Sequence, residues 1–307
     1  MAAERYTAQV ALLVRTLPYV AKETIFALKG GTAINLVYRD LPRLSVDIDL
    51  TYLPVKDRPE SLAEISEAMD RLCGSISSGI QGAQAHRIQG GGGGDTRLQV
   101  RHGRAEIKIE TSPVTRGVVH EPERRIVTDA VEEEFGFAEI QVVAFEDLFG
   151  GKLHAALDRQ HPRDLFDVKL LYEDEGLTDA LFRTFLVYVA SSGRPAHELL
   201  DPHRHPLDAP HAEEFQGMTS RPVTIEELDA TREQLILDIH SRIDEAARHF
   251  LLTLHDAEPN FGAIGLPQAA DLPAVRWKLR NLQRLIEENP SKHADQRAAL
   301  ETLFDRI

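Results

Sequence analysis

The spacing of apolar residues changes from helical to alternating within the first fifty positions. Helical spacing predicts a helix over residues 3–28, although the apolar stretch from Ile25 to Gly30 is also typical of a strand. A short helix is predicted for Thr32 to Tyr38. From Ser45 to Leu50 apolar and polar residues alternate, which predicts a strand with one buried face.

The same reading extends to the rest of the chain. Helical spacing recurs over residues 60–73 and 145–158, Pro162 suits the first turn of another helix, and the chain is mostly helical from residue 181. Two further segments, Arg97–Arg101 and Ala105–Thr111, alternate like the strands of a hairpin. Thr224 and Glu227 have the spacing of a helix-capping box.

These elements predict an α+β protein. We expect a short mixed sheet flanked by helices, followed by a helical C-terminal region. The predicted division is a core over residues 1–115, an intermediate segment over 116–180 that completes the active site, and a helical domain over 181–307. Five consecutive glycines at 90–94 are not followed by Gly-Lys-Ser/Thr, so they predict a surface loop and not a phosphate-binding loop.

Composition restricts the class of protein without assigning an activity. The hydrophobic fraction of 42% and the charged fraction of 27% are ordinary for a globular protein. Cys73 is the single cysteine, which excludes an intrachain disulfide framework, and we expect a cytoplasmic protein that makes no use of a membrane. The net charge of −14 disfavours general nucleic-acid binding, so an RNA partner requires a local basic surface.

Two aspartates in the predicted strand carry the clearest chemistry. Asp47 and Asp49 are two positions apart, so their carboxylates lie on one strand face, where they can share one or two divalent cations. Oxygen ligands of this kind suit Mg²⁺, which completes its shell with water and substrate phosphate. Upstream, the pair Gly30-Gly31 opens a helix whose free amides can approach phosphate closely. This layout is typical of nucleotidyl transfer.

The segment GGTAINL followed by Arg43, Ser45, Asp47 and Asp49 resembles the AbiEii/AbiGii toxin family, which includes the MenT-like toxins. That family is similar to the DNA polymerase β-type nucleotidyltransferase superfamily. The later stretch KLHAALDRQHPRDLFD, from Lys152 to Asp167, resembles a second signature of the family. The resemblance implies an Mg²⁺-dependent enzyme with a two-metal site, and a nucleotide-binding set formed by Gly30, Gly31, Thr32, Ser45 and Lys152.

The superfamily uses a third acid on a neighbouring strand. Glu106, Lys108 and Glu110 share one face of the strand predicted at 105–111. We assign Glu110 as the third metal ligand and catalytic acid, beside Asp47 and Asp49. Glu106 is the substitute if the register differs by two, and an edge strand with solvated charges is the alternative to both.

The second signature predicts further catalytic residues. Lys152 is suited to neutralise a triphosphate, as a point charge on a long side chain. Asp164 and Asp167 fall one turn apart on the next helix, and Asp167 is the one assigned to catalysis, where it would orient Lys152 or Arg163. Asp164 is expected to serve the helix N-terminus or to lie in the neighbourhood of Arg163. An ordinary salt-bridged pair of helices remains the alternative.

A basic stripe near the C-terminus is a candidate RNA contact. Arg276, Arg280 and Arg284 recur at steps of four residues, with Trp277 and Lys278 nearby. The alternative is a solvated helix face neutralised by the glutamates that follow.

The resemblance implies a toxin of a toxin–antitoxin or phage-defence system that transfers NMP from an NTP, with CTP or UTP favoured, to the 3′ acceptor end of tRNA. Its cognate antitoxin would be AbiEi-like or kinase-like. In some relatives the serine that corresponds to Ser45 is phosphorylated by such a partner, and a phosphate there would block nucleotide binding.

Two other hypotheses remain open. A nucleotidyltransferase that modifies a protein or a cationic small molecule, such as an aminoglycoside, would suit the negative charge. A non-catalytic nucleotide-binding protein on the same fold is the third hypothesis.

Overall fold

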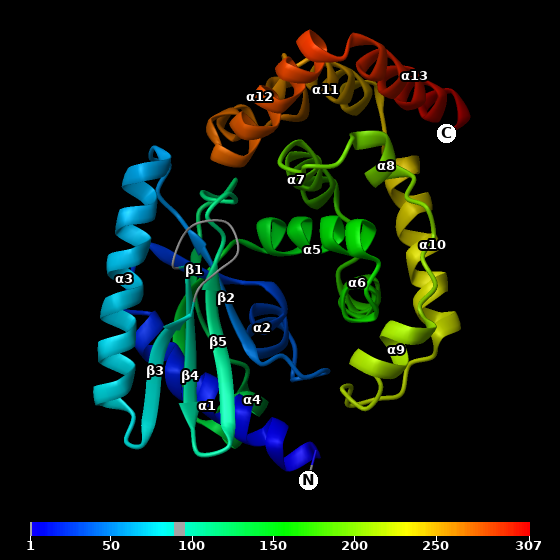
Figure 1. Cartoon of the computed structure of the whole chain (residues 1–307). Helices are drawn as coiled ribbons and strands as arrows, with labels where there is room; N and C mark the ends of the chain where they lie inside the picture. Colours follow the sequence, from blue (N-terminus) through cyan, green and yellow to red (C-terminus); the bar gives the residue numbers. More distant parts are fainter. Residues whose placement is uncertain (1, 89–95) are drawn as a thin grey trace. The chain divides into compact units, whose positions relative to one another are not determined.

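The structure is a computed structural model that describes residues 2–88 and 96–307, with side chains described from Tyr6 onward (Figure 1). Its contacts divide the chain into two compact units. The first unit reaches Ala144 and also includes Met218–Arg221, whereas the second comprises Phe145–Gly217 and Pro222–Ile307. The predicted intermediate segment, residues 116–180, is therefore shared between the two units.

The first unit contains a mixed sheet with its helices. Its elements are α1 (Ala2–Val20), β1 (Phe26–Lys29), α2 (Gly30–Ala33), the π-helix η1 (Ile34–Tyr38), β2 (Asp47–Tyr52), α3 (Arg58–Gly79), β3 (Ala83–Ile88), β4 (Arg97–His102), β5 (Ala105–Thr111), β6 (Glu123–Ile126), α4 (Asp129–Phe135) and β7 (Glu139–Val142).

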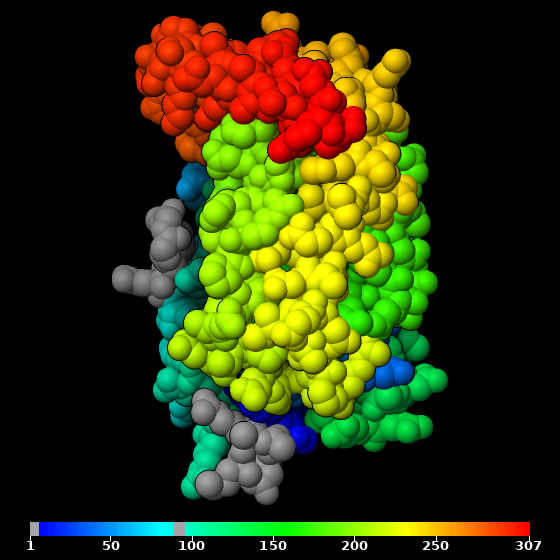
Figure 2. Space-filling model, turned by 90° about the vertical axis from the view of Figure 1, so that its right-hand side faces the viewer, coloured from blue at the N-terminus to red at the C-terminus, as the bar shows by residue number. Residues whose placement is uncertain are grey.

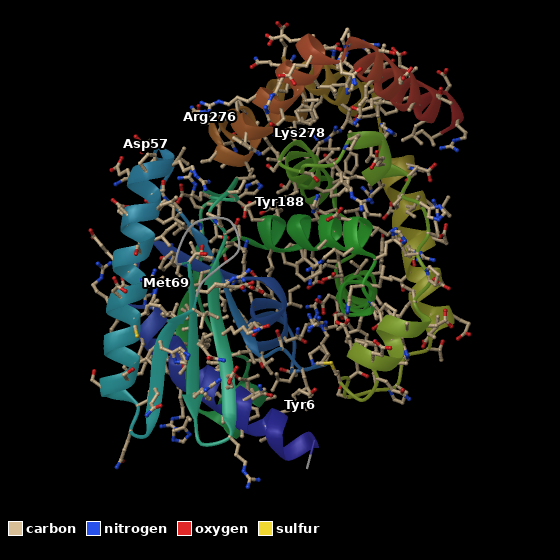
Figure 3. All side chains as sticks on the ribbon, in the orientation of Figure 1. Tyr6, Asp57, Met69, Tyr188, Arg276 and Lys278 are labelled. Atoms are coloured by element: carbon tan, nitrogen blue, oxygen red, sulfur yellow. The ribbon has the colours of Figure 1, made fainter. Side chains whose placement is uncertain are left out.

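The described strands form a seven-stranded sheet in the order β3-β4-β5-β2-β1-β7-β6. Strand β2 pairs antiparallel with β1 on one side and parallel with β5 on the other. Helices α1 and α3 pack against β5, β7, β3 and β4. Met69 of α3, labelled in Figure 3, is fully buried. Ile48 and Leu50 of β2 are also fully buried. Apolar burial of this kind supplies most of the stability of the unit.

The second unit is helical. Its elements are α5 (Phe145–Arg159), α6 (Pro162–Asp174), α7 (Asp179–Ala190), α8 (Ala196–Leu200), α9 (Asp208–Glu214), α10 (Ile225–Ser241), α11 (Glu245–His255), the 3₁₀ turns η2 (Phe261–Ile264) and η3 (Pro267–Asp271), α12 (Pro273–Glu288) and α13 (Pro290–Arg306).

Helices α5 and α7 pack closely against each other. Gly150 and Gly151 of α5 face the ring of Tyr188 on α7, and a Cβ atom on either glycine would lie 3.1 or 3.2 Å from that ring. The Tyr188 hydroxyl donates to Asp147 Oδ1 over 3.0 Å. Figure 2 shows the segment before α10 (lime) running beside α10 itself (yellow), where Arg204 and Glu233 form an ion pair of 3.0 Å.

The predicted fold class is confirmed: a mixed sheet flanked by helices is followed by a helical C-terminal region. The hairpin strands and the capping box of Thr224 and Glu227 are present as predicted. The first helix was predicted too long, because α1 ends at Val20 and the following chain pairs with β2 and β7 as β1. In β1 the pairing with neighbouring strands determines the structure, although the apolar residues have helical spacing.

The five-glycine run at 90–94 lies outside the described residues. Within the described part of the chain, no helix has the length and apolar character that crossing a bilayer requires.

Candidate functional site

Strand β2 carries two carboxylates on one face of the sheet of the first unit. Ile48 and Leu50 are fully buried, whereas Asp47 and Asp49, which alternate with them, are partly exposed. The register places Asp49 between Lys29 of β1 and Glu110 of β5. The period-two geometry of the strand therefore sets both aspartates on the polar face, as predicted.

Gly30 is required for the position of Asp49. Its backbone has φ +72°, a conformation that L side chains rarely adopt, and an added Cβ would lie 2.5 Å from Asp49 Oδ2. The turn between β1 and α2 thus leaves room for a carboxylate. A side chain at this position would displace one of the two acids of β2.

Gly31 makes similar room for a cation. A Cβ atom on Gly31 would lie 2.5 Å from Arg43 Nη2 and 3.1 Å from Ser45 Oγ. Arg43 is buried, and its Nη1 donates to the Leu44 carbonyl over 3.0 Å. The Arg43 guanidinium therefore adds a fixed positive charge at the glycine turn. The sequence contains Arg43 within the resembling motif, but its placement here was not predicted.

Hydroxyl groups tie the glycine turn to the start of β2. The Thr32 and Ser45 hydroxyl oxygens are 2.9 Å apart, and the Thr32 hydroxyl also donates to the Asp47 carbonyl. Thr32 is fully buried, so its side chain serves the local structure. Ser45 is partly exposed and precedes β2, which begins at Asp47.

A distant segment supports this loop from within the same unit. The Leu44 amide donates to the Met218 carbonyl, and the Ser220 amide donates to the Pro42 carbonyl, each over 2.8 Å. The buried Asn35 side chain donates to the Gly31 carbonyl over 2.6 Å and accepts from the Arg43 amide over 3.3 Å. The loop that carries Arg43 and Ser45 is therefore fixed by hydrogen bonds to residues 218–220 and to Asn35.

Lys29 is a charged neighbour that the sequence reasoning missed. It lies directly opposite Asp49 in the register of β1 and β2. Burial lowers the pKa of the Lys29 ammonium, while the charges of Asp49 and Glu110 act in the opposite direction. A cation at this point reduces the repulsion between the carboxylates. In the sequence, only its position immediately before the Gly30-Gly31 pair could have indicated that Lys29 lies beside the carboxylates.

The predicted third acid lies beside Asp49. Glu110 pairs with Asp49 in the parallel register of β2 and β5, and its carboxylate also forms an ion pair with Arg97 of 2.9 Å. Glu106 accepts instead from Arg101 over 2.7 Å, and this bond lowers the pKa of the Glu106 carboxyl. This placement favours Glu110 over Glu106, and its role as a metal ligand stays a prediction.

The donor set suits a hard divalent cation. Asp47 and Asp49 offer carboxylate oxygens from one strand face, and Mg²⁺ commonly binds one or two carboxylates together with waters and substrate phosphate. Among the described residues, no three His, Cys, Asp or Glu side chains converge into a metal-binding group. Glu110 would have to leave Arg97 to join the two aspartates.

The second signature forms a buried ion cluster in the second unit. Lys152 Nζ of α5 is 2.9 Å from Asp164 Oδ1 and 2.8 Å from Asp167 Oδ2, both on α6. Arg159 Nη2 reaches the other oxygen of Asp164 over 2.9 Å. The side chains of Lys152, Asp164 and Asp167 are at most 7% exposed. Lys152 and Arg159 thus both pair with Asp164, and Lys152 also pairs with Asp167. The catalytic roles predicted for Lys152 and Asp167 stay predictions.

The three C-terminal arginines share an exposed face of α12. Arg276, Arg280 and Arg284 are exposed, while Val275 and Leu282 are buried on the same helix. The four-residue spacing predicted that the three arginines lie on one face of the helix. Contact of this face with RNA stays a prediction.

Comparison with known proteins adds a family assignment. A family model described as the nucleotidyl transferase AbiEii toxin of the type IV toxin–antitoxin system matches residues 11–281. A comparison of the sequence with curated proteins finds no match.

The fold is also similar to a solved structure, MenT4, described as the nucleotidyltransferase toxin Rv2826c from Mycobacterium tuberculosis H37Rv. The alignment has a TM-score of 0.61 and 18% sequence identity, and it covers 90% of this chain and 93% of that chain. At this identity the likeness concerns the fold.

Replacement of Gly30 by alanine tests the close approach of Asp49. We expect the control Gly103→Ala to lower the free energy of unfolding by about 1–2 kcal/mol, because its φ is positive. Gly30→Ala should lower it by at least as much, because its φ is also positive and its Cβ must displace the Asp49 carboxylate. Gly103 has open space around its Cβ position, so only Gly30→Ala should also weaken binding of Mn²⁺ and nucleotide. Calorimetric titration checks this. Equal metal and nucleotide affinities in the two variants would contradict the account.

Replacement of Lys152 by methionine tests the buried ion cluster. We expect Lys152→Met to lower the free energy of unfolding by about 3–5 kcal/mol, because it leaves two buried carboxylates without their shared cation. The control Lys169→Met removes partly exposed ion pairs with Glu173 and Glu227 and should cost less than about 1 kcal/mol. Adding Asp167→Asn to Lys152→Met should restore part of the loss. Chemical denaturation checks these values, and similar losses in the two lysine variants would refute the cluster's role.

Proposed function

Because the chain belongs to the AbiEii family of nucleotidyltransferase toxins, we propose that it transfers a nucleoside monophosphate from an NTP to the 3′ acceptor end of tRNA. The observation that carries the proposal is the polar face of β2, where Asp47 and Asp49 lie beside the Gly30-Gly31 turn and the Arg43 guanidinium. The carboxylates can bind the metal ion that accompanies an NTP, and the fixed cation at the same turn can bind its phosphates.

The two aspartates, the Arg43 guanidinium and the glycine turn each have a defined part in the proposed reaction. Asp47 and Asp49 would hold Mg²⁺, which when bound would polarise the α-phosphate and stabilise the leaving pyrophosphate. The Arg43 guanidinium would attract the triphosphate, and the turn with Gly31 would allow its approach. Transfer forms a bond between the 3′ oxygen of the acceptor and the α-phosphorus, and it breaks the bond to pyrophosphate. Positioning and electrostatics would supply most of the rate.

The finer features of the proposal come from the family. We favour CTP or UTP as donor and tRNA as acceptor, with the protein acting in the cytoplasm, so that the transfer would block translation. Membership in a type IV toxin–antitoxin family implies a cognate antitoxin. An antitoxin of the kinase-like kind would act on Ser45, whereas an AbiEi-like antitoxin would leave Ser45 unmodified.

Transfer of label tests the proposed activity. Each α-labelled NTP is incubated with Mg²⁺ and total tRNA, using the wild type, Asp47→Asn and the control Asp70→Asn on the exposed side of α3. We expect label on tRNA 3′ ends, lowered by more than about a hundredfold in Asp47→Asn, since even outer-shell metal partners contribute up to this factor. Asp70→Asn should retain the wild-type rate.

Two other results of this assay would contradict the tRNA acceptor. Label on an added aminoglycoside or on protein, and none on tRNA, would assign a different acceptor, which the net charge of −14 would suit. Binding of NTP with no transfer to any acceptor would indicate a non-catalytic nucleotide-binding protein.

A negative charge at Ser45 tests the proposed regulation. Ser45→Asp should weaken NTP binding by about tenfold, because a like charge a few ångströms from phosphate costs about 1–4 kcal/mol. Ser45→Ala removes the hydroxyl and its bond to Thr32 without adding charge, so it should weaken NTP binding less than Ser45→Asp does. Titration with each variant checks this, and equal affinities for Ser45→Asp and Ser45→Ala would argue against a phosphorylation switch.

A further inference from the structure

Helix α12 is a local basic element in an acidic protein. From Pro273 to Ile286 it contains four cationic residues and no acidic residue, whereas the whole chain has a net charge of −14. Figure 2 shows α12 and α13 (orange to red) at the surface of the second unit. A local group of exposed cations is the kind of feature that attracts a polyanion to a protein whose net charge is negative.

The exposed side of α12 combines these charges with an aromatic ring. Arg276, Trp277, Arg280 and Arg284 are exposed, and Trp277, the only tryptophan of the chain, is 57% exposed. These four residues are called the α12 face. Trp277, Arg280 and Arg284 follow at intervals of three and four residues, so their side chains are neighbours on the helix surface.

The fourth cation of α12 fixes the helix and does not belong to this face. Lys278 is 7% exposed, and its ammonium donates to the Arg194 carbonyl in the loop after α7. Burial lowers the pKa of Lys278 to about 8. Figure 3 labels Arg276 and Lys278 on different sides of α12. The α12 face is therefore presented by a helix that is anchored to the body of its unit.

The arginines of the α12 face can exchange their carboxylate partners for phosphate. Arg276 pairs with Asp271 over 2.6 Å and Arg284 with Glu288 over 3.3 Å, and all four side chains are more than half exposed. Exposed pairs of this kind contribute about 0–1 kcal/mol, so a phosphate can replace the carboxylate at little cost. Within the described parts of the chain, no carboxylate lies within ion-pair distance of Arg280.

We propose that the α12 face binds single-stranded RNA, with Trp277 stacked on a base and the three arginines on the flanking phosphates. Aromatic rings interleaved with cations are the recurring design of single-strand binding surfaces. Arg276 and Arg284 are separated by about 12 Å along the helix axis. That length matches three to four stacked nucleotides at about 3.4 Å each.

This inference rests on the proposed function in one respect, because it takes the nucleotide acceptor to be RNA. It adds a binding surface in the second unit that the proposed reaction does not use. A protein partner could also be anchored by a tryptophan and arginines, and the experiment separates that case.

Because Trp277 is the only tryptophan, its fluorescence reports directly on the face. The full chain is titrated with an eight-nucleotide oligouridylate, and Trp277 emission is recorded beside the anisotropy of a fluorescein-labelled copy of that RNA. We expect saturable quenching by the RNA and none by NTP alone. The RNA affinity should fall about tenfold in Trp277→Ala and recover largely in Trp277→Phe, since each stacked base contributes a factor of this order.

The arginines are tested through the salt dependence of the same binding. Arg280→Gln should lower the slope of log K against log salt by about 0.7, the value for one phosphate contact on a single strand. The control Arg124→Gln on exposed β6 should leave the slope unchanged. Thermal unfolding of each variant confirms that it folds, which is expected because all of these side chains are exposed.

The outcomes separate this surface from the proposed reaction. If tRNA accepts nucleotide but RNA neither quenches Trp277 nor binds less tightly to Trp277→Ala, the α12 face is not the RNA surface and the proposed function stands. A face that binds only a protein partner would overturn the inference in the same way. If RNA binds through the face and no RNA accepts label, the inference holds and the proposed acceptor is wrong.

Discussion

The pairing of β2 between β1 and β5 determines where the charged groups of the first unit lie. A strand at this position buries one face, so Ile48 and Leu50 commit Asp47 and Asp49 to the other. The same register sets Lys29, Asp49 and Glu110 side by side across three strands. The sheet therefore places a cation next to two acids, which limits their repulsion in the folded chain.

The loop before β2 depends on this pairing and reinforces it. Glycines at positions 30 and 31 leave space for Asp49 and Arg43. Residues 218–220, which are distant in sequence, hold the loop by backbone hydrogen bonds. The second unit uses a different arrangement, in which Lys152 is buried between two carboxylates. Such a cluster is costly to break because removal of Lys152 takes an ion-pair partner from two buried carboxylates at once.

Local patterns in the sequence were sufficient for much of this structure. The alternation around Asp47 and Asp49 predicted their shared face, and the motif at Thr224 predicted its capping box. Helical spacing over residues 145–158 and the placement of Pro162 predicted the two helices that carry the ion cluster. In each case the determining contacts lie within one or two turns, or within one strand, so the sequence contains the whole pattern.

Other features depend on contacts between distant residues. Lys29 was missed because one cation at the end of a strand has no periodic signal, and its neighbours are set by the register. The pairing of residues 42–44 with 218–220 joins segments far apart in sequence. The ion pair of Glu110 with Arg97 depends on the hairpin register, and the end of α1 at Val20 depends on the pairing of β1. Tertiary contacts decided each of these.

The central claim is that Asp47 and Asp49 bind the metal and the nucleotide beside the Gly30-Gly31 turn. Anomalous diffraction at the manganese edge, from crystals grown with Mn²⁺ and a non-hydrolysable CTP analogue, tests it most directly. The account predicts manganese bound by both carboxylates, with the triphosphate next to Arg43. Manganese and triphosphate bound elsewhere, with neither at these carboxylates, would contradict it.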